Sequence, residues 1–164
     1  GTFTNQSGSV LCERAEKGHF CGQRGMSEPV PCPMGTFSKQ EGQSQCQNCT
    51  AGQYSDGVMS TACLRCPVGR FADREGKVEC TACPVPGTST PGPGANHISE
   101  CICLGATYMR EDNQTCQPCP PGLTCSDGVR TIQPGFFGDD YDSIFACHGD
   151  RRRCIGGGAG QGCA

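Results

Sequence analysis

The segment CPMGTFSKQEGQSQCQNC, residues 32–49, decides the fold, because its pattern returns in the residues that follow without a break. Cysteines recur every 17 residues, and three of them have a partner three residues earlier, which defines a C-x13-C-x2 repeat. The cysteines of the period are Cys32, Cys49, Cys66 and Cys83, and the earlier partners are Cys46, Cys63 and Cys80. Counting from the first cysteine of each repeat as position 0, glycine recurs at +3 (Gly35, Gly52, Gly69) and an aromatic residue at +5 (Phe37, Tyr54, Phe71). Such a constant spacing predicts a tandem repeat protein.

The composition predicts that covalent bonds, not a large core, hold the chain together. It has 17 Cys, 25 Gly, 12 Pro and no Trp among 164 residues. Burial of so few apolar side chains cannot offset the conformational entropy lost on folding. Cysteines at this density indicate a disulfide scaffold made in an oxidising compartment, and hence a secreted protein or a cell-surface ectodomain. Three N-x-[ST] sequons, at Asn5, Asn48 and Asn113, predict N-linked glycans.

A single repeat contains one aromatic residue and too few apolar side chains to fold alone. In the chain-entropy model, a disulfide that closes a loop of about 14 residues stabilises it by roughly 3 kcal/mol. We expect the aromatic residue to pack on this disulfide and the +3 glycine to permit the turn after the half-cystine. The predicted fold class is small and disulfide-rich: an elongated tandem array of short β-hairpin and turn modules with little hydrophobic core, in which repeats touch only their neighbours and stack as a rod.

The segments at residues 32–49 and 66–83 resemble the ephrin-receptor-type cysteine-rich (GCC-type) repeat and the one-disulfide module of tumour-necrosis-factor-receptor ectodomains. The resemblance extends over residues 1–125. It implies an extracellular ladder with half-cystines paired in sequence order, although sequence alone does not prove connectivity. The implied pairs are Cys32–Cys46, Cys49–Cys63, Cys66–Cys80, Cys83–Cys101, Cys103–Cys116 and Cys119–Cys125. Residues 126–164 resemble, more loosely, the Cys/Gly-rich segment that follows such repeats in large surface proteins.

We expect three segments: residues 1–31, a partial repeat plus a short Cys loop; residues 32–125, the tandem repeats; and residues 126–164, a divergent Cys/Gly-rich end. Residues 1–3 match Gly35-Thr36-Phe37, so the chain is expected to begin inside a repeat. Residues 15–21 align with the short loop 119–125, but Ala15 replaces its first cysteine. The stretch 84–96 lengthens one repeat and is expected to be a flexible linker or, alternatively, a binding loop.

Several cysteines have no partner under the resemblance. Cys12 and Cys21 can pair with each other, and Cys21–Cys32 is a rival pairing. Cys147 and Cys154 are expected to pair locally. Cys163 is then the odd cysteine, and Cys12 and Cys163 are candidates for an intermolecular disulfide or for partners outside the chain.

Other chemistry is weaker than the disulfide interpretation. Four C-x2-C pairs resemble zinc ligands or a redox motif, but their constant period and the glycine and aromatic positions favour disulfides. Asp139, Asp140 and Asp142 could bind Ca²⁺, although they lack the alternation of an EF-hand loop and a solvated turn is favoured. No cofactor is predicted. The three histidines, at 19, 97 and 148, have no catalytic neighbours in the sequence, so we predict that the protein is not an enzyme.

Function is therefore expected to be structural or to lie in binding. A net charge of −3 does not suggest nucleic acid as a partner, and no apolar run is long enough for membrane insertion. The exposed positions of the repeats are bland and polar, which favours a spacer, a surface stalk or a filament protomer whose partners are neighbouring copies or other extracellular proteins. The alternative is a ligand-binding ectodomain fragment of a receptor.

Overall fold

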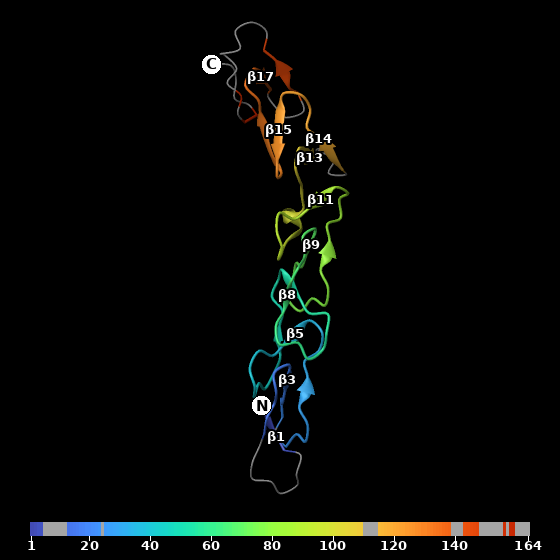
Figure 1. Ribbon diagram of the computed structural model, residues 1–164, viewed down its shortest axis with the longest axis vertical. Coiled ribbons are helices and arrows are strands. Elements are labelled where there is room, and N and C mark those ends of the chain that lie inside the picture. The colour runs from blue at the N-terminus through green and yellow to red at the C-terminus, as the bar shows by residue number, and fades with distance from the viewer. Residues whose placement is uncertain are drawn as a thin grey trace. The chain divides into compact units, whose positions relative to one another are not determined.

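A computed structural model describes residues 1–4, 13–23, 25–109, 115–138, 143–147, 156 and 158–159. The chain divides into two compact units (Figure 1). Unit 1 comprises Gly1–Ala82 and Gly92–Glu100, and unit 2 comprises Cys83–Pro91 and Cys101–Ala164. The expected division at residues 31 and 125 stays a prediction.

Every strand that the structure describes belongs to a two-stranded antiparallel hairpin. The described residues of unit 1 form five hairpins: β1 (Thr2–Phe3) with β2 (Glu13–Arg14), β3 (His19–Phe20) with β4 (Val30–Pro31), β5 (Thr36–Phe37) with β6 (Gln47–Asn48), β7 (Gln53–Tyr54) with β8 (Leu64–Arg65), and β9 (Arg70–Phe71) with β10 (Thr81–Ala82). It also has one short 3-10 helix, η1 (Ile98–Glu100). The small, disulfide-rich hairpin fold predicted from the repeat is confirmed.

The +3 glycine forms the turn that starts each hairpin. Gly35 has φ of 81°, in the left-handed region that favours glycine. After the turn, the Thr36 N–H donates to the carbonyl of Pro33 (3.1 Å). The hairpin ends at the next half-cystine, Cys49, whose N–H donates to the Gly35 carbonyl (2.9 Å). The same two bonds recur one period later, from Gln53 and Cys66.

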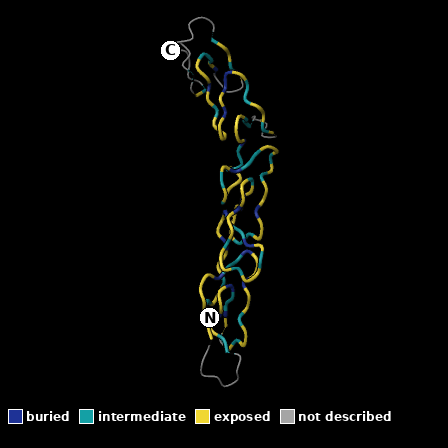
Figure 2. The backbone as a smooth tube through the Cα atoms, viewed as in Figure 1, coloured by how far each residue is buried: buried dark blue, intermediate teal, exposed yellow. Residues whose placement is uncertain are grey.

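The interior consists mostly of half-cystines and small residues. Figure 2 shows the buried residues as short, separate stretches along the tube. Cys66, Ala72 and Cys80 form a buried cluster, and Tyr54 packs against it. Tyr54 belongs to the repeat that begins at Cys49, so this aromatic side chain covers the disulfide of the following repeat. The minimal core of a repeat is therefore shared with its neighbour.

Residues 15–31 form a complete repeat that has no disulfide. Ala15, fully buried, occupies position 0, and its repeat keeps the standard bonds: His19 N–H to Glu16 carbonyl (3.0 Å) and Cys32 N–H to Gly18 carbonyl (2.8 Å). Pro29 occupies the position of the second half-cystine. The alignment of residues 15–21 with the short loop 119–125 was therefore wrong; the 17-residue period continues upstream of Cys32.

This register also corrects the pairing expected for Cys21. Cys21 is a buried free cysteine, and Cys32 pairs with Cys46, so neither Cys12–Cys21 nor Cys21–Cys32 is present. The reason is its place at position +6, where the other repeats bury a small side chain and form no disulfide. Equivalent residues are Ser38, Ser55 and Ala72.

The lengthened repeat, Cys83–Cys101, is ordered, which corrects the expectation of a flexible linker at 84–96. The Ala72 N–H donates to the Ala95 carbonyl (3.0 Å), and the Gly94 N–H donates to the Cys66 carbonyl (2.8 Å). The helix η1 follows this stretch, and the Glu100 carboxylate at its end accepts from the N–H of Asn96 (2.7 Å). The additional residues are thus absorbed by local turns.

Unit 2 continues the hairpin pattern, with longer strands between residues 107 and 132. Its strands pair in chain order: β11 (Thr88–Ser89) with β12 (Ile102–Cys103), β13 (Thr107–Met109) with β14 (Cys116–Pro118), β15 (Leu123–Ser126) with β16 (Val129–Ile132), and β17 (Phe136–Phe137) with β18 (Phe145–Ala146). The β15–β16 turn is Asp127-Gly128, with φ of 49° and 81°, as a two-residue hairpin loop of type I′ requires. Buried Leu123 and Ile132 face each other in this hairpin and give it an apolar side.

The disulfide-free repeat predicts that a disulfide can be added there. In a Cys21→Ser background, which matches Ser38 and Ser55, we expect Ala15→Cys with Pro29→Cys to form a disulfide and to stabilise the protein by roughly 3 kcal/mol. Denaturant unfolding with and without reductant measures this gain. Ala15→Cys alone is the control, and a pair of free thiols in the double variant would contradict the assigned register.

Candidate functional site: the interlocked repeats

Backbone hydrogen bonds join each repeat of unit 1 to the next. The Gly35 N–H donates to the Ser55 carbonyl (2.8 Å), and the Ser38 N–H donates to the Ser60 carbonyl (3.0 Å). One period later, Gly52 donates to Ala72 (2.9 Å) and Ser55 to Lys77 (3.1 Å). Because these bonds use only main-chain groups, they place few demands on the exposed side chains.

A further bond runs in the opposite direction. The residue at +10 donates its N–H to the carbonyl of the preceding position 0, as Gly76 does to Cys49 (2.8 Å) and Met59 does to Cys32 (2.9 Å). The bonds therefore cross each repeat boundary in both directions, and neither repeat can tilt without breaking one of them.

The +3 glycines also meet a repeat two places along the chain. A Cβ at Gly35 would lie closer than 3.0 Å to the carbonyl group of Gly76, and a Cβ at Gly52 would meet Gly94 in the same way. The expectation that repeats touch only their neighbours was therefore wrong. Two features therefore require glycine at +3: the turn has a positive φ, and the close approach of the other repeat leaves no space for a Cβ.

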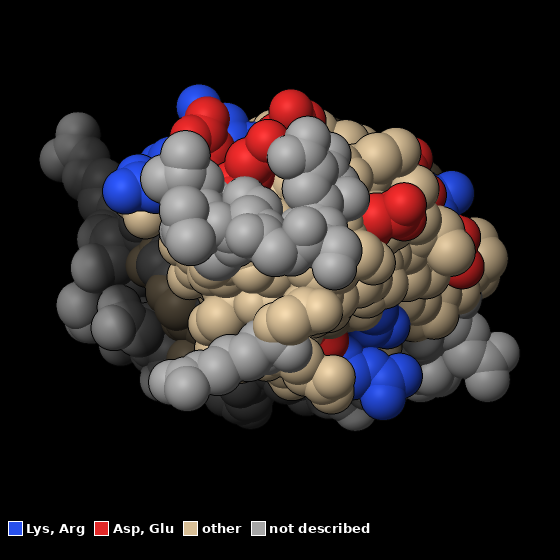
Figure 3. Space-filling view, turned by 90° about the horizontal axis from the view of Figure 1, so that it is seen from below, with Lys and Arg blue, Asp and Glu red and all other residues tan. Residues whose placement is uncertain are grey.

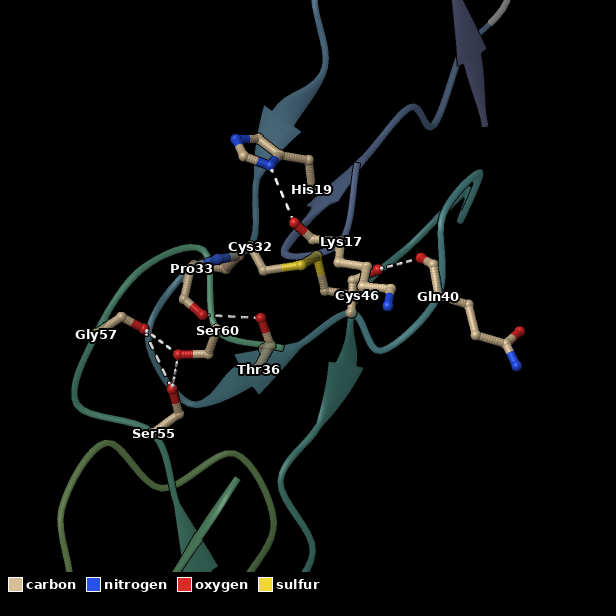
Figure 4. Close-up of a disulfide and its surroundings, with 11 residues drawn as sticks. Lys17, His19, Cys32, Pro33, Thr36, Gln40, Cys46, Ser55, Gly57 and Ser60 are labelled. Carbon is tan, nitrogen blue, oxygen red and sulfur yellow. Dashed lines mark hydrogen bonds between the residues drawn. A yellow bond between two sulfur atoms is a disulfide. The ribbon is translucent and has the colours of Figure 1, made fainter. Parts of the chain in front are cut away.

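Side chains add to the contact around the Cys32–Cys46 disulfide (Figure 4). The Thr36 hydroxyl donates to the Pro33 carbonyl (2.8 Å). From the next repeat, the Ser55 hydroxyl donates to that of Ser60 (2.6 Å), which in turn donates to the Gly57 carbonyl (3.0 Å). This network fixes the turn that carries position +10.

Met59 departs from the repeat at that turn. Its φ is 60°, whereas the equivalent residues are glycines with positive φ: Gly25, Gly42, Gly76 and Gly94. The Met59 side chain is half exposed, so no burial offsets the strain of this conformation. Met59 is not among the residues predicted from the sequence, although it stands at the position where the neighbouring repeats have Gly42 and Gly76.

The charged side chains of the array are dispersed. Figure 3 shows acidic and basic residues interspersed with uncharged ones on the face in view. A close ion pair joins Lys77 Nζ to the Asp73 carboxylate (3.1 Å), and the hydrogen bond from Lys77 lowers the pKa of Asp73. In the part of the chain that the structure describes, no group of three or more His, Cys, Asp or Glu side chains could hold a metal ion.

Six disulfides have both half-cystines among the described residues, and they join the pairs that the resemblance implies: Cys32–Cys46, Cys49–Cys63, Cys66–Cys80, Cys83–Cys101, Cys103–Cys116 and Cys119–Cys125. The cysteines of the C-x2-C pairs are consumed in these bonds, so their thiolates are not available to zinc. Cys147 is also disulfide-bonded. The other predicted site residues, apart from Asn48, lie outside the described residues: Asn5, Cys12, Asn113, Asp139, Asp140, Asp142, Cys154 and Cys163.

The comparison with protein families identifies the array. A family model described as tyrosine-protein kinase ephrin type A/B receptor-like matches residues 18–62 and 52–101, which together span just over half of the chain. The chain belongs to this ephrin-receptor-like family. The first match begins at Gly18, inside the disulfide-free repeat at residues 15–31. This agrees with the hydrogen bonds that this repeat shares with the others. The comparison with curated proteins finds no match.

The stability of unit 1, an ephrin-receptor-like array, should depend on the absence of a Cβ at +3. We expect Gly35→Ala to destabilise the protein by about 2–4 kcal/mol, because a strained φ and a steric clash with Gly76 add together. Gly25→Ala is the matched control: its φ is +80°, but nothing lies within 4 Å of the added Cβ, so about 1 kcal/mol is expected. Equal losses for the two variants in denaturant unfolding would show that the close approach has no energetic role.

The strain at Met59 predicts a stabilising substitution. We expect Met59→Gly to raise the free energy of unfolding by about 1 kcal/mol, because glycine adopts a positive φ without steric cost. Met59→Ala removes the same side chain but keeps the strain, and it should give no such gain. Thermal unfolding of the two variants and the unsubstituted protein measures the difference; equal stability of the Gly and Ala variants would contradict it.

Proposed function

We propose that the chain is a non-enzymatic extracellular structural protein whose interlocked repeats act as a spacer, a surface stalk or a filament protomer. Extracellular location is supported by six disulfides and by membership of a receptor-ectodomain family. Among the described residues, no helix has the length and apolarity needed to cross a bilayer.

The observation that carries this proposal is the two-way bonding between repeats. Gly35 donates forward to Ser55, and Gly76 donates back to Cys49, so bending at a boundary breaks a main-chain hydrogen bond. A spacer needs this resistance to bending, and it does not need particular side chains on its surface. Short or polar residues such as Ser44, Gln45 and Thr61 are exposed between these bonds, together with single apolar side chains such as Leu64 and Val68.

The alternative is a ligand-binding receptor ectodomain. It is supported by the family description, which names a receptor, and by the exposed apolar pair Val58 and Met59. A binding role would depend on particular side chains in one repeat, whereas a spacer role depends on the number of repeats and their register.

Deletion of one period tests this difference. We expect removal of residues 49–65 to leave a folded, shorter array, because Asn48 is then followed by Cys66 and the C-x2-C spacing is kept. Removal of residues 49–64 is the control, since it shifts the register by one residue and should lower thermal stability and scramble the disulfides. Small-angle scattering, thermal unfolding and a disulfide map measure these outcomes.

Imaging of the protein on its native surface then separates the two roles. Regular polymers or anchored stalks whose length falls with the 49–65 deletion support a spacer. Isolated monomers that capture a soluble partner, and lose it when a single repeat is removed, would overturn the structural role in favour of the receptor role.

A further inference from the structure

The sequon Asn48-Cys49-Thr50 lies where three repeats meet. Cys49 is fully buried and bonded through its sulfur to Cys63. Its N–H donates to the Gly35 carbonyl (2.9 Å) in the preceding repeat, and its carbonyl accepts from the Gly76 N–H (2.8 Å) in the following one. The middle residue of the sequon therefore has no freedom once the array has formed.

The two outer residues of the sequon are exposed, yet their backbone is also fixed. Asn48 is the last residue of β6 and pairs with Thr36 in β5. The Thr50 carbonyl accepts from the Gln53 N–H (3.0 Å) and so belongs to the next turn. The Asn48 amide and the Thr50 hydroxyl thus point from a strand and a turn that are both held in place.

We propose that Asn48 is a folding-gated glycosylation site, which accepts an N-linked glycan only before the Cys49–Cys63 disulfide closes and the Gly76 turn docks. The proposal requires passage through the secretory pathway but does not depend on whether the protein is a spacer or a receptor. Its failure therefore leaves the proposed function untouched.

The transfer needs a chain segment that can bend into an enzyme. The donor is a lipid-diphosphate-linked oligosaccharide. A bond forms between Asn48 Nδ2 and the anomeric carbon of the first sugar, the bond from that carbon to the diphosphate oxygen breaks, the lipid diphosphate leaves with the electron pair, and the amide nitrogen loses one proton. An enzyme that must hold the amide and the Thr50 hydroxyl together cannot do so while Cys49 is bonded to three other residues.

Disulfide formation is the competing reaction. The thiols of Cys49 and Cys63 lose two protons and two electrons to an incoming disulfide, which is reduced to two thiols. Docking of Gly76 follows only after the chain beyond residue 76 has been made. At roughly 5–20 residues per second of synthesis, the interval between Asn48 and Gly76 is a few seconds, so the two reactions compete on the same timescale.

The folded array accommodates the glycan once it is attached. Asn48 is exposed and lies beside the Gly76 turn: a Cβ built on Gly76 would lie 3.9 Å from Asn48 Cγ and Oδ1. A glycan on Nδ2 would therefore cover this turn without entering the core. Both the modified and the unmodified chain can fold, which predicts partial occupancy.

The test is to express the full chain in secreting animal cells and to measure Asn48 occupancy by enzymatic deglycosylation in heavy-oxygen water followed by mass spectrometry. We expect Cys63→Ser, which leaves the sequon intact, to raise the occupancy at least about twofold, because the competing disulfide cannot form. Brief treatment of cells with a membrane-permeant thiol should raise it in the unsubstituted chain. Occupancy is read on intracellular and secreted pools, so retention of a misfolded variant does not hide the result.

Two controls make the outcome specific. Cys116→Ser breaks the Cys103–Cys116 disulfide of unit 2 and should leave Asn48 occupancy unchanged. Thr50→Ala destroys the sequon and should remove the glycan at Asn48 altogether. Unchanged occupancy in Cys63→Ser, an equal rise in Cys116→Ser, or no glycan at Asn48 in any variant would overturn the proposal.

Discussion

The close approach of the +3 glycine to the turn two repeats along is the constraint on which the rest of unit 1 depends. At Gly35, the missing Cβ lets the carbonyl of Gly76 lie against the backbone, and the positive φ aims the Gly35 N–H at Ser55. Any larger residue would separate these repeats and lengthen the bonds across the boundary. The exposed side chains are then not needed to hold the repeats together, in keeping with the proposed spacer role.

Disulfides and hydrogen bonds have separate roles in this array. The repeat at residues 15–31 shows this directly, because it keeps its turns and boundary bonds with Ala15 in place of a half-cystine. Main-chain bonds therefore define the conformation, whereas the disulfides disfavour the unfolded chain by closing loops. One repeat thus keeps the common conformation without a disulfide while both of its boundaries are hydrogen-bonded.

The interlock also gives the array an order of assembly. A hydrogen bond such as that from Gly76 to Cys49 forms only when a later repeat has been synthesised, so each repeat is completed by the ones that follow it. Chemical groups near position 0 are accessible early and fixed afterwards. Asn48 is the proposed glycan acceptor, and its neighbour Cys49 passes through that change.

The sequence by itself determined the period, the hairpin turns and the family, because half-cystine spacing and a glycine that must have positive φ are local properties. Position +3 at Gly35, Gly52 and Gly69 was enough to predict the turn. Only the tertiary structure decided which repeats touch, since the approach of Gly35 to Gly76 joins residues far apart in the chain. It alone placed Ala15 at a half-cystine position and Cys21 in the interior, because identity at these sites follows from packing between repeats and not from cysteine spacing.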